Sequence, residues 1–168
     1  MARGIGDDGR ERARGNQPVA SGLDRFVAAQ DAVYRQVRAE LARGEKQSHW
    51  MWFFFPQLAG LGTSPMAQRY AIGSLPEARA YLRHRILGRR LAETTQMMLG
   101  WAGRRSAVAI LGPVDALKFC SSMTLFELAA TGEGDRLDPY GHALDAFCQG
   151  RRDERTLQLL DLASVHAA

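Results

Sequence analysis

His49 opens the most unusual segment of the chain, since it stands directly before six consecutive large apolar residues, 50–55, which Pro56 and Gln57 close. A histidine can take up and release a proton near neutral pH, so His49 is a candidate general acid or base. The indole of Trp50 and the amide of Gln57 could orient a planar ligand beside it. The segment therefore predicts a ligand site at its two ends.

The same aromatic run has a simpler interpretation, which is the hydrophobic core. Aromatic side chains bury roughly 150–250 Å² each and dominate the cores of small domains. We therefore assign residues 52–55 to the core and keep His49, Trp50 and Gln57 as candidates for chemistry. A lone histidine is also often a residue with only a structural hydrogen bond, and Gln57 could equally cap a loop.

A second group of polar residues lies in the apolar stretch 114–130. Asp115 and Lys118 are three positions apart, so they can pair on one helix face, and Ser122 follows Lys118 by four. We infer that Lys118 is a second catalytic candidate, either as an anion contact or as the activator of a serine nucleophile. Asp115, Ser121 and Ser122 are then further ligand contacts. The alternative is a helix-capping aspartate with serines that permit close helix packing.

Three ring-bearing residues complete the candidates for ligand binding. The hydroxyls of Tyr70 and Tyr81 could serve a ligand or a buried acceptor. His84 lies in the arginine-rich stretch 79–105, where, with Glu77 included, seven arginines minus two glutamates give a local charge of +5. Such a surface could bind phosphate-bearing ligands or nucleic acid, although a solvated face is the usual explanation.

The overall charge and the cysteines exclude several classes of protein. The net charge is +4, but 20 of the 22 basic residues are arginine, which indicates a coding bias more than a phosphate-binding face. Cys120 and Cys148 match neither a disulfide framework nor the spacing of a zinc site, so we expect small buried hydrophobes in a reducing compartment. No metal site or cofactor motif is present. With neither a signal-like nor a membrane-spanning apolar stretch, the sequence predicts a cytoplasmic location and no membrane contact.

Helices must position these candidates. Residues 1–20 are rich in Gly and Arg and nearly free of large apolar side chains, so we expect a mobile tail before a single domain, 21–168. Residues 114–130 are apolar around nearly the whole circumference, which predicts a central buried helix. The run 50–55 has no period and is either a buried strand or a helical turn. Further helices are expected over 21–43, 64–70, 74–101 with a break at Gly88, 140–149 and from 153 onwards. The expected fold is all-α, a compact irregular bundle of about six to eight helices.

Several segments together resemble one bacterial family, catalogued as domain of unknown function 1810. The resemblance runs over about residues 23–162, and the segments that carry it are Leu23-Asp24-Arg25-Phe26, Ser48-His49-Trp50-Met51-Trp52, Phe55-Pro56-Gln57, Gly60-Leu61-Gly62, Ala80-Tyr81-Leu82 with His84, Asp115-Ala116-Leu117-Lys118 and Ser121-Ser122-Met123-Thr124-Leu125-Phe126. It implies an all-helical fold and brings no established biochemistry. Arg85 stands where the family usually has a proline, and Cys120 stands where it usually has a basic residue.

Three classes of function remain open from the sequence. The first is a binding protein or enzyme for a nucleotide-like or phosphorylated small molecule, with His49 as acid or base and Lys118 as anion contact. The second is a protein-interaction or accessory module whose aromatic run is only core. The third is a nucleic-acid binder that uses the arginine-rich surface 79–105. The oligomeric state is left open.

Overall fold

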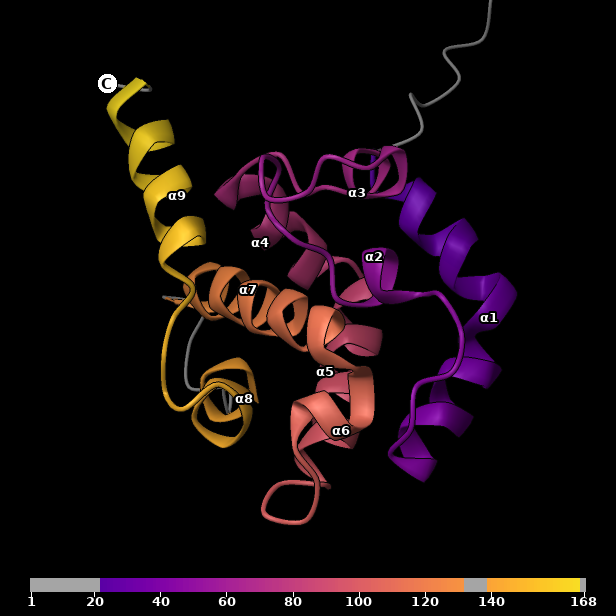
Figure 1. The fold of residues 1–168 in the computed structure, drawn as a ribbon. Helices are drawn as coiled ribbons and strands as arrows, with labels where there is room; N and C mark the ends of the chain where they lie inside the picture. The colour runs from indigo at the N-terminus through magenta and orange to yellow at the C-terminus, as the bar shows by residue number, and fades with distance from the viewer. Residues whose placement is uncertain (1–21, 132–138, 167–168) are drawn as a thin grey trace, which may run out of the picture.

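The computed structural model describes residues 22–131 and 139–166, with side chains to residue 161, and over these residues it has nine α-helices and no strand (Figure 1). The helices are α1 (Asp24–Arg43), α2 (Met51–Phe54), α3 (Pro65–Arg69), α4 (Leu75–Arg83), α5 (Leu87–Leu99), α6 (Ala107–Leu111), α7 (Pro113–Ala130), α8 (Pro139–Phe147) and α9 (Glu154–His166). The all-α expectation is confirmed. The count exceeds six to eight because α2 and α6, of 4 and 5 residues, are too short to show a period. The tail 1–20 lies outside the described residues, and the single domain 21–168 stays a prediction.

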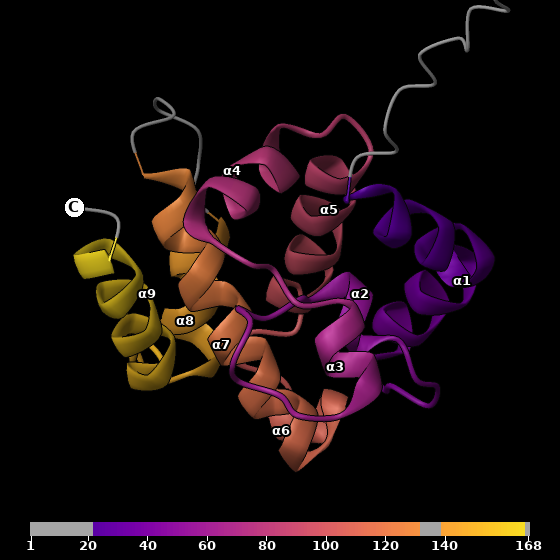
Figure 2. The same ribbon diagram turned by 90° about the horizontal axis from the view of Figure 1, so that it is seen from above.

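Helix α7 is the central helix, as its composition predicts. It packs against α2, α4, α6, α8 and α9, and its residues 119–130 are all buried or half-buried. Its first turns are more open, because Val114 and Leu117 are exposed. In both ribbon views α8 and α9 lie on one side of α7 and α1 lies on the other (Figures 1 and 2). Phe119, Met123 and Phe126 on α7 are fully buried. Neither α7 nor any other helix over the described residues is long and apolar enough to cross a bilayer.

The aromatic run forms a single helical turn, α2, rather than a strand. Phe53, Phe54 and Phe55 are buried, and their rings contact Tyr70, Tyr34 and Phe119 respectively. These three phenylalanines are core residues, as predicted. Through these contacts the aromatic run packs against α1, against α7 and against the segment that follows α3. The run therefore holds parts of the chain that are distant in sequence in contact with one another.

Local sequence signals mark several of the helix ends. Gly44 ends α1 in the left-handed conformation, with φ of 67°. The hydroxyls of Ser64 and Ser74 accept the backbone N–H groups of Ala67 and Glu77 at the starts of α3 and α4. The expected break near Gly88 falls at residues 84–86.

Gly88 has a structural requirement of its own. A Cβ atom at this position would lie 2.0 Å from the carbonyl oxygen of Leu82, so α5 can approach the end of α4 only if residue 88 lacks a side chain. The glycine therefore permits the tight α4–α5 connection rather than ending a helix.

The two cysteines correct the sequence-based expectation. Cys120 on α7 and Cys148, directly after α8, form a disulfide with their Cα atoms 6.0 Å apart. They are 28 positions apart in sequence, and only the packing of α7 against α8 brings them together, so their spacing could not predict the pair. They are therefore not free buried thiols. The cytoplasmic location stays a prediction and loses the support of reduced cysteines.

Candidate functional site

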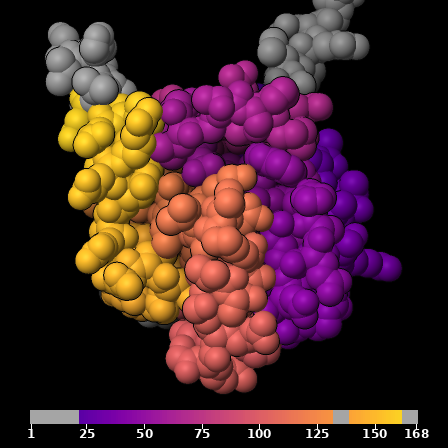
Figure 3. All heavy atoms as spheres, viewed as in Figure 1, coloured from indigo at the N-terminus to yellow at the C-terminus, as the bar shows by residue number. Residues whose placement is uncertain are grey.

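A cleft of about 170 Å³ opens between α2, α7 and the segment 57–71. On the face shown in Figure 3, α7 (orange) meets the purple to magenta part of the chain that contains α2 and α3. The wall is largely apolar and includes Met51, Trp52, Phe55 and Leu58. A small, mainly apolar cleft with a few polar groups is the usual form of a small-molecule site.

Two backbone hydrogen bonds fix the segment that forms the far wall. The N–H of Ala59 donates to the carbonyl of Ile72 at 2.8 Å, and the N–H of Ile72 donates to the carbonyl of Gln57 at 2.9 Å. These bonds hold the start and the end of the segment 57–72 side by side, although α3 lies between them in sequence. Gln57 and Tyr70 are thereby placed on the same cleft.

Four polar side chains line this cleft: Gln57, Gln68, Tyr70 and Lys118. The amide of Gln68 donates to the carbonyl of Thr63 at 3.2 Å. Among the described residues, neither the amide of Gln57 nor the hydroxyl of Tyr70 makes a side-chain hydrogen bond. The ammonium of Lys118 has one carboxylate partner, Asp115, at 3.5 Å, and it lies 5.5 Å from the centre of the Trp52 ring. The cleft therefore offers a cation, an amide, a hydroxyl and an aromatic surface to one ligand.

The only two lysines of the chain meet at one carboxylate. Lys46 donates to Asp115 at 2.8 Å, and Lys118 approaches the other oxygen of Asp115 at 3.5 Å. The side chain of Lys46 is 8% exposed and lies over the Trp50 ring, whereas that of Lys118 is 29% exposed and faces the cleft wall at Trp52. Lys46 thus fixes Asp115 from the inside, and Asp115 in turn orients Lys118.

Glu40 holds the loop that carries Lys46. Its carboxylate is almost fully buried, and it accepts hydrogen bonds from the Ser48 hydroxyl at 2.6 Å, the Trp50 indole at 2.8 Å and the backbone N–H groups of Gln47 and Ser48. Burial alone would raise the pKa of Glu40, but these hydrogen bonds outweigh it and lower the pKa to about 2. The ionised carboxylate therefore anchors the turn between α1 and α2.

The two residues at the start of the aromatic run are separated from the cleft. His49 is exposed and is not among the cleft-lining residues. Trp50 is buried, and its indole N–H is used by Glu40 at 2.8 Å. The structure therefore brings Gln57 to the cleft but not His49 or Trp50.

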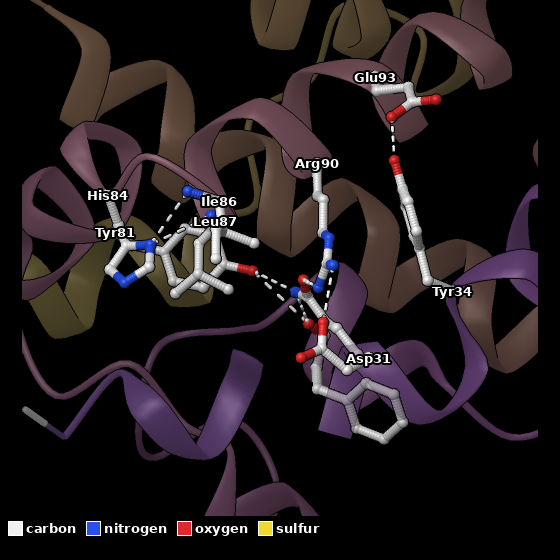
Figure 4. Close-up of polar contacts among 10 residues, drawn as sticks. Asp31, Tyr34, Tyr81, His84, Ile86, Leu87, Arg90 and Glu93 are labelled. Atoms are coloured by element: carbon white, nitrogen blue, oxygen red, sulfur yellow. Dashed lines mark hydrogen bonds and ion pairs between the residues drawn. The ribbon is translucent and has the colours of Figure 1, made fainter. Parts of the chain in front are cut away.

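Three further candidates have partners inside the fold. Tyr81 is buried, which raises its pKa, and its hydroxyl accepts from the Gln30 amide at 3.0 Å. The Nδ1 atom of His84 accepts the backbone N–H groups of Ile86 and Leu87, so His84 caps the start of α5 (Figure 4). Ser121 donates to the carbonyl of Leu117 one turn earlier on α7. None of these three lines the cleft.

Ser122 is different, because its buried hydroxyl has no hydrogen-bond partner among the described residues. It follows Lys118 by four positions, but no hydrogen bond joins the two side chains. The pairing of Asp115 with Lys118 is confirmed. The expected contact between Lys118 and Ser122, which a serine nucleophile would need, is therefore not formed, because the Ser122 hydroxyl is buried without a partner among the described residues.

A second hollow, of about 400 Å³, runs along α1 beside Arg90. Four of its polar side chains, Asp31, Tyr34, Gln36 and Arg90, are paired within the fold. Arg90 binds Asp31 at 2.7 Å and lies over the Tyr34 ring at 4.4 Å, while the Tyr34 hydroxyl donates to Glu93 (Figure 4). The Glu93 contact and burial raise the pKa of Tyr34. This hollow therefore resembles a seam between α1 and α5 more than a binding site.

The comparisons with known proteins agree with this fold. The sequence profile described as "Protein of unknown function (DUF1810)" matches residues 20–160. The chain belongs to this family. The resemblance noted in the sequence is thereby confirmed, and it assigns no activity to the cleft.

One solved structure is similar, and no curated protein matches the chain. That structure is the conserved hypothetical protein Rv1873 from Mycobacterium tuberculosis, a crystal structure at 1.38 Å. It is 50% identical in sequence, with a TM-score of 0.77, and the match covers 83% of this chain and 96% of that one. The family fold is therefore represented by an experimental structure.

Sequence reasoning missed three residues around the cleft. Trp52 was assigned to the core, but it is only half-buried and forms the aromatic wall, because a run without a period does not show which residue faces out. Lys46 could have been found from the rarity of lysine in the chain. Glu40 could have been found from its position three residues after Val37, on the buried side of α1. Over the described residues, no group of three or more His, Cys, Asp or Glu side chains could hold a metal ion.

Proposed function

We propose that the protein binds a small, planar, negatively charged molecule in the cleft formed by Trp52, Gln57, Tyr70 and Lys118. The observation that carries the proposal is the set of polar side chains without protein hydrogen bonds, Gln57 and Tyr70, beside a cation and an exposed aromatic face. Polar groups elsewhere in the described fold are mostly paired, as expected for a stable protein. Groups that are left unpaired in a preformed cleft are available to a ligand.

The chemistry of the proposed ligand follows from the groups around it. A ring could stack on Trp52, and a negative charge could pair with the ammonium of Lys118. Gln57 could both donate to and accept from the edge of the ring, and Tyr70 could do the same through its hydroxyl. We propose binding rather than catalysis, because His49, the candidate acid or base, lies outside the cleft.

The two alternatives have less support. On the arginine-rich surface, Arg90 pairs with Asp31, and the exposed Arg104 and Arg105 donate to the carbonyls of Gly100 and Ala109. The exposed apolar side chains on α6 and α7 are Val108, Val114 and Leu117, of which Val114 and Leu117 are neighbours on one face of α7, and folded monomers commonly show small apolar groups of this kind. The polar and aromatic residues of the cleft, in contrast, lie together at one place.

A thermal-shift screen tests the proposal. Nucleotides, sugar phosphates and aromatic carboxylates would be tested against the wild type and against Lys118→Met. A ligand at ten times its Kd adds about 1.4 kcal/mol to the free energy of unfolding, which raises Tm by roughly 3–6 °C. We expect a shift with at least one anionic ring compound and its loss in Lys118→Met.

The matched control is Arg89→Ala, which also removes one positive charge. Arg89 is exposed on α5 and does not line the cleft. We expect this variant to keep the full shift. Equal losses in both variants would mean that the effect is general electrostatics, and the absence of any shift with the wild type would contradict the proposal.

A further inference from the structure

The cleft has a single cation that a ligand can reach. Among its described lining residues, Lys118 is the one with a charged side chain. Lys46 is 8% exposed and engaged with Asp115 at 2.8 Å, so it contributes charge but no contact. The three groups Lys46, Asp115 and Lys118 sum to two positive charges minus one negative, which leaves +1 to be neutralised. One negative charge on the ligand satisfies this balance.

The kind of cation also matters. Arginine makes up 20 of the 22 basic residues, yet the cleft contains one of the two lysines and no arginine. The guanidinium fork suits two-point recognition of phosphate and carboxylate alike, whereas the ammonium of lysine is a compact point charge that carries a single positive charge to the ligand. A phosphate dianion in this cleft would meet one cation and keep an uncompensated charge against an apolar wall, which is costly.

The volume limits the size of the ligand. A cavity of roughly 150 Å³ accommodates one benzene molecule, and this cleft measures about 170 Å³. A nucleotide adds a sugar and a phosphate to its base, so it exceeds this space and part of it would lie outside the cleft. A single ring with one small substituent fits both contacts at once.

We propose that the ligand of this cleft is a single aromatic or heteroaromatic ring that carries one carboxylate. This inference rests on the proposed function and narrows it, because it excludes nucleotides and other phosphorylated compounds. The ring lies on Trp52, and one carboxylate oxygen pairs with Lys118. Gln57 and Tyr70 hydrogen-bond to the second carboxylate oxygen or to a ring nitrogen.

Matched acids and amides test the charge requirement. Nicotinate and nicotinamide, and benzoate and benzamide, differ in the charged group and keep the ring. Titration calorimetry or ligand-observed NMR would measure the Kd of each compound, of AMP and of inorganic phosphate. We expect each acid to bind at least ten-fold more tightly than its amide, and AMP and phosphate to bind more weakly than the acids.

The variant Lys118→Met tests whether the difference in affinity between acid and amide depends on Lys118. The variant keeps the length of the side chain and removes its charge, so we expect acid and amide to bind it equally, with the affinity of the amide unchanged. Retained amide binding also shows that the variant cleft is folded. Arg89→Ala should keep the acid–amide difference.

The possible results separate this inference from the proposed function. If AMP or phosphate binds more tightly than the acids and loses affinity in Lys118→Met, the carboxylate class is wrong and the cleft remains an anion site. If acid and amide bind the wild type equally, the charge argument is wrong. If no compound of the panel binds the folded wild type, both proposals are overturned.

Discussion

Glu40 and Lys118 are two charged residues at neighbouring places in the fold, and they differ in how their charges are satisfied. The carboxylate of Glu40 is buried and accepts hydrogen bonds from three neighbours in the loop after α1. The side chain of Lys118 is 29% exposed and lines a cleft, and its ammonium has one carboxylate partner at 3.5 Å. A fully satisfied charge stabilises the fold, whereas an incompletely satisfied charge beside a cleft has capacity left for a ligand.

The largest expected loss of stability is that of Glu40→Ala, which removes the fully hydrogen-bonded charge of the pair. Removal of the carboxylate leaves the indole of Trp50 and the N–H groups of Gln47 and Ser48 without their acceptor. We expect the free energy of unfolding to fall by about 3–4 kcal/mol, measured by urea denaturation. Glu45→Gln, an exposed glutamate of the same loop, should change it by less than about 0.5 kcal/mol. If both variants change the free energy of unfolding by similarly small amounts, Glu40 does not stabilise the fold as proposed.

Acid should weaken the same network. The pKa of Glu40 is lowered from 4.5 to about 2 in the folded state, so its contribution is complete above pH 4.5 and is lost as the pH falls through 2. At about 1.4 kcal/mol for each pH unit between the two pKa values, the contribution is about 3 kcal/mol. The difference in unfolding free energy between the wild type and Glu40→Gln should therefore shrink between pH 5 and pH 2. A difference that stays constant over this range would contradict the lowered pKa.

Substitution of the two lysines should change the free energy of unfolding by smaller amounts, and by different amounts for Lys46 and Lys118. Lys46→Met removes the inner partner of Asp115 at 2.8 Å, and we expect a loss of about 1–2 kcal/mol. Lys118→Met removes a longer and more exposed contact, and we expect a change within about 0.5 kcal/mol. Urea denaturation of both variants checks this order. If Lys118→Met proves the more destabilising, Lys118 is a scaffold residue and the cleft loses its cation.

Ser122→Ala is expected to have the smallest effect. Its hydroxyl is buried without a hydrogen-bond partner among the described residues, so its removal relieves a desolvation cost and leaves no partner unsatisfied. We expect the unfolding free energy to stay unchanged or to rise by up to about 1 kcal/mol. Thr124→Val on the same helix is the matched control, because the Thr124 hydroxyl accepts from the N–H of Asp153 at 2.9 Å, and this variant should be destabilised.

Most of the helical fold could be predicted from local patterns. The stretch that forms α7 is apolar on all sides, and a helix of that kind has to be central. Ser64, Ser74 and Gly44 mark helix ends by chemistry that acts within a few residues. The disulfide between Cys120 and Cys148 could not be predicted, because it depends on how α7 and α8 pack.

The candidate site was predictable in part, for the same reason. Gln57, Tyr70 and Lys118 were selected individually as polar groups beside apolar segments, and the structure brings all three to one cleft. His49, Trp50, Tyr81 and His84 were candidates in the sequence as well. What separates the two sets is whether the fold supplies a hydrogen-bond partner or a position on the cleft, and both are tertiary properties.

The scarcity of lysine has a practical consequence. Apart from the amino terminus of the chain, Lys46 and Lys118 carry its only primary amines, and both lie on Asp115. Reductive methylation with ¹³C-formaldehyde would therefore place NMR-visible methyl groups at this site and at the amino terminus alone, with Lys118 the more exposed of the two lysines. The methyl signal of Lys118 would then report on whether a ligand occupies the cleft.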